Sequence, residues 1–132
     1  MTIQHVLFEG DNPKMPPLSL AAAAHNFLFV SGTPGYDAAF ELSDHFPEQL
    51  RHTLARLHET LARGGATPRD VIKTTLYLTR AGDLPELNRQ YAEFFMSAPY
   101  PARTTCVVAA LPDPKMLVEI ECIAVLPTGS AP

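Results

Sequence analysis

Two charged residues near the C-terminal end of the chain stand in otherwise apolar segments. Arg103 lies in PARTTC and Glu119 lies in VEIEC. An arginine at the mouth of a strand presents a planar fork that can bind a carboxylate through two hydrogen bonds. A glutamate in an apolar strand is partly desolvated, which raises its pKa and suits it to proton transfer. The simpler alternative, favoured by periodicity alone, is an ion pair that joins two neighbouring strands.

The alternation of side chains along a strand indicates which residues could act together. It places Arg103 and Thr105 on one face of the first segment. In the second segment Glu119 and Glu121 share a face, opposite a row of apolar residues. Each charged residue therefore has a polar neighbour on its own face.

Other candidate chemistry is weaker. The histidines lack partners at a metal-ligand spacing, so we expect no metal site. They are His5, His25, His45, His52 and His58. Cys106 and Cys122 have apolar neighbours and are expected to pack as small hydrophobic residues, although a nucleophilic role stays open. Gly32 and Gly35 lack a nucleotide-binding spacing, but their loop could offer backbone N–H groups to a small ligand, or be a plain turn.

Six segments have the composition and alternation of strands. They are residues 3–8, 18–24, 27–31, 71–79, 104–109 and 117–126. The segment 32–40, with two glycines and a proline, is expected to be a loop.

Two further segments have helical periodicity. The first has apolar residues at spacings of three and four from Phe46 to Leu61, with Ser43 or Asp44 as the cap and Gly64-Gly65 as the end. The second follows Asp83, with Glu86 placed to complete a capping box.

This order predicts an α+β fold in which a six-stranded mixed sheet carries two helices on a single face. Two helices cover only one face of such a sheet. The strand residues are too apolar for the second face to be wet, so we expect an oligomer that buries sheet faces between subunits.

The composition narrows the functional classes. A chain of 132 residues is expected to form one domain, residues 1–132, with 127–132 as a flexible tail. The net charge of −4 and the lack of a basic stripe argue against nucleic acid as a partner. We expect no membrane span, no signal peptide and a cytoplasmic location with free thiols.

Several segments, taken in order, resemble the RidA/YjgF family, also called the L-PSP endoribonuclease group. They are VSG (30–32), DVIKTTLYLT (70–79), LNRQYAEFF (87–95), PARTT (101–105) and VEIECIAV (118–125). The resemblance implies a chorismate-mutase-like fold and a homotrimer with sites between subunits. It also implies hydrolysis of reactive 2-imino and enamine acids, such as 2-aminoacrylate and 2-iminopropanoate, to a keto acid and ammonia without a cofactor.

The resemblance also assigns roles to single residues. Arg103 matches the arginine that binds the substrate carboxylate, and Glu119 matches the glutamate that positions the attacking water. Thr105 stands where the family places a small polar residue or cysteine near the substrate. Ser31 and Gly32 match the loop that lines the pocket.

One position departs from the family pattern. A pocket tyrosine is usual near the N-terminus, but the stretch PPLSL places Leu18 there. The pocket wall becomes more apolar, which favours a bulkier substrate or a pathway-specific enamine deaminase of the aminomuconate type. A non-catalytic trimer that binds small carboxylates remains an alternative, and a ribonuclease is disfavoured by the charge. Asn88 matches a helix asparagine that we interpret as structural.

Overall fold

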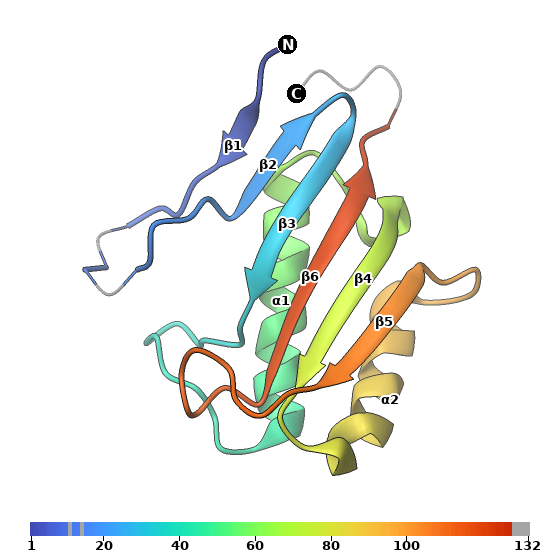
Figure 1. The fold of residues 1–132 in the computed structure, drawn as a ribbon. Coiled ribbons are helices and arrows are strands. Elements are labelled where there is room, and N and C mark those ends of the chain that lie inside the picture. The colour runs from blue at the N-terminus through green and yellow to red at the C-terminus, as the bar shows by residue number, and fades with distance from the viewer. Residues whose placement is uncertain (11, 14, 128–132) are drawn as a thin grey trace.

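The apolar pattern of the chain forms one six-stranded mixed sheet with two helices on the same face (Figure 1). The computed structural model describes residues 1–10, 12–13 and 15–127, so the expected tail from 128 onward lies outside the described residues. The strands are β1 (Gln4–Val6), β2 (Ala21–Ala24), β3 (Phe27–Thr33), β4 (Val71–Leu78), β5 (Ala102–Val107) and β6 (Val118–Val125). Their order is β1-β2-β3-β6-β4-β5, and only the β4–β5 pair is parallel.

The two helices are α1 (Phe46–Arg63) and α2 (Leu84–Phe95), and both lie behind the sheet in the view of Figure 1. Short 3-10 helices, η1 (Pro68–Asp70) and η2 (Ala81–Asp83), precede β4 and α2. The predicted apolar face of α1 is confirmed, because Phe46, Leu50, Leu54, Leu57 and Leu61 are all buried in the core. The predicted α+β class and the predicted layer of two helices are confirmed.

The predicted helix starts are wrong in detail. Residue His45 occupies the N-cap of α1 without a side-chain cap, and Ser43 Oγ accepts a hydrogen bond from the His45 N–H. Asp83 does occupy the N-cap position of α2, as predicted, but its carboxylate binds Arg80 and caps no N–H, while Glu86 pairs with Arg89 instead of closing a capping box. The predicted end of α1 is confirmed: Gly65 has a φ of +89°, a left-handed conformation that glycine adopts without strain.

All six strand boundaries differ from the prediction by one to three residues: β1, β4 and β6 are only shorter, and the other three bear on the site. Residues 18–20 lie outside β2, where the side chain of Ser31 rather than a backbone N–H binds the Ser19 carbonyl. Strand β3 continues to Thr33, with a register shift between Val30 and Thr33, although a loop was expected from residue 32. Strand β5 begins at Ala102, so Arg103 lies within the strand.

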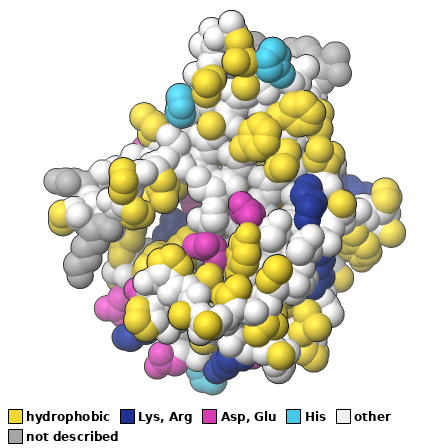
Figure 2. All heavy atoms as spheres, viewed as in Figure 1, with side chains coloured by type: hydrophobic (Ala, Val, Ile, Leu, Met, Phe, Trp, Pro, Cys, Tyr) yellow, Lys and Arg dark blue, Asp and Glu magenta, His cyan; other side chains and the backbone are white. Residues whose placement is uncertain are grey.

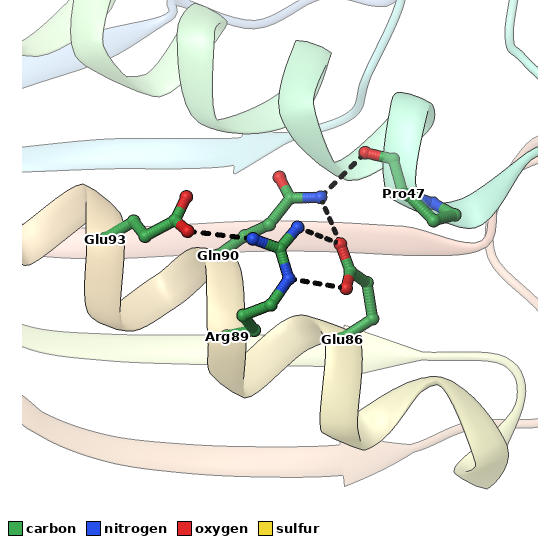
Figure 3. A network of polar contacts seen from close by, with 5 residues as sticks. All are labelled: Pro47, Glu86, Arg89, Gln90 and Glu93. Carbon is green, nitrogen blue, oxygen red and sulfur yellow. Dashed lines mark hydrogen bonds and ion pairs between the residues drawn. The ribbon is translucent and has the colours of Figure 1, made fainter.

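A network of polar side chains on α2 reaches the start of α1 (Figure 3). Arg89 donates to both carboxylate oxygens of Glu86, at 2.8 and 2.7 Å, and to Glu93 at 2.8 Å. Gln90 Nε2 donates to Glu86 and to the carbonyl of Pro47. The network lies on the outer, helical side of the molecule.

Gln49 of α1 is fully buried and connects the helix to the loop before β6. Its Nε2 donates to the carbonyls of Ser43 and Lys115, and its Oε1 accepts from the N–H of Leu117 at 2.6 Å. This side chain therefore ties α1 to the residues that lead into β6, the strand that carries Glu119.

The face of the sheet turned away from the helices is open in the single chain (Figure 2). It presents hydrophobic side chains around carboxylates near its centre. Phe29 is 51% exposed there, and Phe27 and Val125 are also exposed. No helix in the described part of the chain is long and apolar enough to cross a bilayer.

Candidate active site

Arg103 lies on edge strand β5 and is held by three neutral groups. Its Nε donates to Thr105 Oγ1 at 2.8 Å, which confirms that the two residues share a face. Its Nη2 donates to Asn88 Oδ1 at 2.7 Å, so this asparagine orients the arginine. Its guanidinium carbon lies 4.7 Å from the ring centroid of Tyr91. All three contacts lie on the helix-covered side, because Asn88 and Tyr91 belong to α2.

Within residues 1–10, 12–13 and 15–127, the charge of Arg103 has no counter-ion. Among the described residues no carboxylate lies within 4 Å of its guanidinium. A guanidinium carries five N–H donors. Two of the five are used, on Thr105 and Asn88, and the other three are on Nη1 and Nη2. This group is fixed in place and has donors left for an anion such as a carboxylate.

Glu119 of β6 lies on the open face of the sheet. Its strand neighbours Val118 and Ile120 are buried toward the helices, whereas Glu119 is half-buried. Gly32 packs against it so closely that a Cβ at position 32 would lie 2.8 Å from Glu119 Oε1. Burial, and then the charge of Glu121, raise the pKa of Glu119. A carboxylate with a raised pKa is suited to accepting a proton from water.

Glu121 and Tyr77 accompany Glu119 on this face, and Tyr77 was missed by the sequence analysis. The Tyr77 hydroxyl donates to Glu121 Oε1 at 2.9 Å. This bond, more than the charge of the carboxylate, raises the pKa of Tyr77. Tyr77 pairs with Glu119 across the β4–β6 ladder. Strand alternation could have placed Tyr77 on one face of its strand, but the register that brings it beside Glu119 is not visible in sequence.

Tyr36, in the loop after β3, is a second missed neighbour. Its hydroxyl donates to Asp113 Oδ2 at 3.4 Å, and burial, followed by Asp113, raises the pKa of Tyr36. The negative charge of Glu119 also raises the pKa of Tyr36, so the carboxylate and the phenol interact electrostatically. The backbone of this loop lies directly against α1 at Gly35. A Cβ at that position would collide with the carbonyl oxygen of Gln49, so only glycine fits there.

An open hollow of about 440 Å³ adjoins these groups on the open face. Ser31 and Glu121 line it, together with His5, Ser19 and Phe29. Ser31 Oγ donates to the Ser19 carbonyl at 2.7 Å, so this hydroxyl holds the loop before β2. Leu18 lies in that loop, is 43% exposed and is not among the residues that line the hollow.

The structure does not bring Arg103 and Glu119 together within one chain. Strand β4 lies between β5 and β6, and the two side chains point to opposite faces of the sheet. The ion pair between neighbouring strands, which periodicity favoured, is therefore wrong. Ser31, Gly32 and Glu119 gather on the open face, and Arg103 and Thr105 gather beside α2.

The remaining candidates do not form a site. Cys122 is buried, and burial raises its pKa to about 12, which disfavours a thiolate nucleophile. Cys106 is only partly buried and is a free thiol. In the described ranges, no three histidine, cysteine or carboxylate side chains cluster as metal ligands would.

Comparison with known proteins finds a matching family profile, similar sequences and similar folds. The profile of the family described as Endoribonuclease L-PSP matches residues 11–126. A chloroplastic Reactive Intermediate Deaminase A from Arabidopsis thaliana is 39% identical over 83% of this chain, which spans 59% of that relative's length. The 3-aminoacrylate deaminase RutC of Acinetobacter baylyi is 33% identical over 90% of this chain and 94% of its own. The crystal structure of RidA from an Antarctic Psychrobacter covers 93% of this chain and 99% of its own, at 30% identity and a TM-score of 0.85.

Proposed function

Since the chain belongs to the endoribonuclease L-PSP family, we propose that it is a cofactor-independent deaminase of reactive 2-imino and enamine acids. The products are a keto acid and ammonia. Relatives named as a reactive intermediate deaminase and a 3-aminoacrylate deaminase support this reaction class. The observation that carries the proposal is the guanidinium of Arg103, which is oriented by neutral groups and keeps donors for a carboxylate.

The chemistry needs little beyond positioning. Arg103 binds the substrate carboxylate, and Thr105 lies beside it. Glu119 accepts a proton as water adds to the imine carbon, which forms a carbinolamine. The same carboxyl group returns that proton to the nitrogen. It then takes the proton of the carbinolamine hydroxyl as the C=O bond forms and delivers it to the nitrogen as the C–N bond breaks, so that ammonia leaves. The raised pKa of Glu119 suits both transfers.

A site that contains both residues must combine two copies of the chain. Arg103 and Glu119 lie on opposite faces of the sheet, so the Glu119 region of one copy would face the Arg103 region of another. The exposed apolar side chains on the open face, such as Phe29, favour burial between subunits. We therefore expect a homotrimer with three interfacial sites, as the family resemblance implies.

The preferred substrate side chain is inferred from two positions. Leu18 stands where the family has a tyrosine, and Phe29 lines the hollow beside Ser31 and Glu121. Both residues favour an imine with an apolar side chain over the smallest one. An aminomuconate-type enamine fits the same parts. Carboxylate binding without turnover is the competing role.

Imino acids generated in place by an amino-acid oxidase would test the function. We expect faster release of ammonia and keto acid from alanine-, leucine- and phenylalanine-derived imines, with the larger side chains preferred. Arg103→Ala and Glu119→Gln should abolish the acceleration, and Arg51→Ala, at an exposed surface arginine, should not. No acceleration with any imine, in a protein that light scattering shows to be trimeric, would leave the binding role. A monomer would remove the interfacial site.

A further inference from the structure

The ring of Tyr91 lies beneath the guanidinium of Arg103 and is held by contacts with Thr74 and Phe95. Tyr91 is only 4% exposed, and its hydroxyl shares a buried hydrogen bond of 2.7 Å with Thr74 Oγ1. Its ring also packs 4.7 Å from the ring of Phe95. Thr74 is the cross-strand partner of Arg103 in the parallel β4–β5 pair. Tyr91 therefore contacts both members of this pair. Its hydroxyl binds Thr74 of β4, and its ring lies under Arg103 of β5.

These contacts fix both the position and the free edge of the guanidinium. The ring supports one face of the planar group, while Thr105 binds Nε and Asn88 binds Nη2. The donors that remain belong to Nη1 and Nη2, which together form the end-on fork for a carboxylate. A free arginine samples many rotamers and loses them when it binds an anion. A guanidinium that is already held avoids most of that loss.

We infer that Tyr91, anchored by Thr74, is a positioning residue that presents the Nη1–Nη2 edge of Arg103 to the substrate carboxylate. The inference rests on the proposed function, in which Arg103 binds that carboxylate. Tyr91 does not touch the substrate. Its effect is on ground-state and transition-state binding alike, because the carboxylate is held throughout the reaction and does not change charge.

The test compares variants of the full-length protein by two readouts. The first is the split between KM and kcat with the alanine-derived imine. The second is the Kd for pyruvate, a stable 2-oxo acid, measured by calorimetry, with methyl pyruvate as the probe that lacks a carboxylate. Tyr91→Leu removes the ring, and Tyr91→Phe keeps the ring but loses the bond to Thr74. Phe94→Leu is the control, because that ring lies in the same helix as Tyr91 but packs on Phe95 and on His58 of α1.

We expect Tyr91→Leu to raise KM and the pyruvate Kd about ten-fold, with kcat within about two-fold of wild type. Tyr91→Phe should raise KM and the Kd by only about two- to three-fold, because the ring stays and only its bond to Thr74 is lost. Phe94→Leu should lower the melting temperature without changing KM or Kd. A folded Tyr91→Leu protein with wild-type KM and Kd overturns the inference. If Tyr91→Leu does not fold, wild-type KM and Kd in both Tyr91→Phe and Thr74→Val overturn it instead.

Failure of the proposed function gives a different result. A wild-type protein that binds pyruvate but not methyl pyruvate, and hydrolyses no imine, would refute the deaminase proposal. The Kd series would then still test the role of Tyr91. A wild-type protein that neither binds pyruvate nor hydrolyses any imine overturns both the deaminase proposal and the inference about Tyr91. An active protein whose Tyr91 variants differ from wild type in kcat alone keeps the function and overturns the inference.

Discussion

Gly32 and Glu119 are packed so closely that any side chain at position 32 would meet the Glu119 carboxylate. A methyl group on residue 32 would lie 2.8 Å from Glu119 Oε1 and 2.9 Å from its carboxyl carbon. The neighbour that must move is the end of a flexible side chain, so the fold can accommodate the change. The position of the carboxylate cannot stay the same.

We predict that Gly32→Ala keeps its melting temperature within a few degrees and loses about ten- to a hundred-fold in kcat/KM. The loss follows from the displacement of the group that receives the proton from water. Gly82→Ala is the matched control, because no heavy atom lies within 4 Å of a Cβ built there. Full activity in Gly32→Ala would mean that the reaction does not depend on where this carboxylate lies.

The pH profile of activity should report the neighbours of Glu119. Burial and the charge of Glu121 raise the pKa of Glu119, so kcat/KM should fall as the pH drops through a value above the ordinary 4.5. Glu121→Gln removes a negative charge, which lowers the pKa of Glu119 and moves this acidic limb to lower pH. Tyr77 and Tyr36 also face Glu119 but stay neutral in this range. Glu41→Gln, at an exposed site, is the control, and an unmoved limb in Glu121→Gln would contradict the assignment.

The network of Figure 3 should make stability depend on pH at the acidic end. Hydrogen bonds from Arg89 and then Gln90 lower the pKa of Glu86 from 4.5 to about 2. A lowered folded-state pKa means that the contribution is complete above about pH 4.5 and is lost as the pH falls through about 2. We expect Glu86→Gln to lower the melting temperature at pH 7, with the difference from wild type vanishing near pH 2. Glu93→Gln, which loses one bond at an exposed site, should show a smaller effect at pH 7.

Buried Gln49 should matter more for stability than any surface amide. Gln49→Leu leaves the N–H of Leu117 and the carbonyls of Ser43 and Lys115 without this partner. We expect a loss of about 2–4 kcal/mol in the free energy of unfolding by urea, because buried polar groups would be left unpaired. Gln90→Ala, whose amide bonds lie at the surface, should lose less than about 1 kcal/mol. Equal losses in the two variants would show that burial of the amide is not what matters.

Local patterns predicted most of the secondary structure. Six of six expected strands and both helices are present, because side-chain period and glycine or proline punctuation act within a few residues. The wrong predictions occur where a side chain from another segment determines the local hydrogen bonds. The Ser19 carbonyl is bound by the side chain of Ser31, and the carboxylate of Asp83, at the N-cap of α2, is bound by Arg80 instead of capping the helix.

The sequence by itself determined the fold class, the family and the residue types that can bind a carboxylate and move a proton. It also determined that Arg103 shares a face with Thr105, since alternation along one strand is local. Only the tertiary structure decided that β4 separates β5 from β6, and that Arg103 and Glu119 point to opposite faces. It alone placed Tyr91 under Arg103 and Tyr77 beside Glu119. Strand order and register depend on hydrogen bonds and packing between segments far apart in the chain, which no local period encodes.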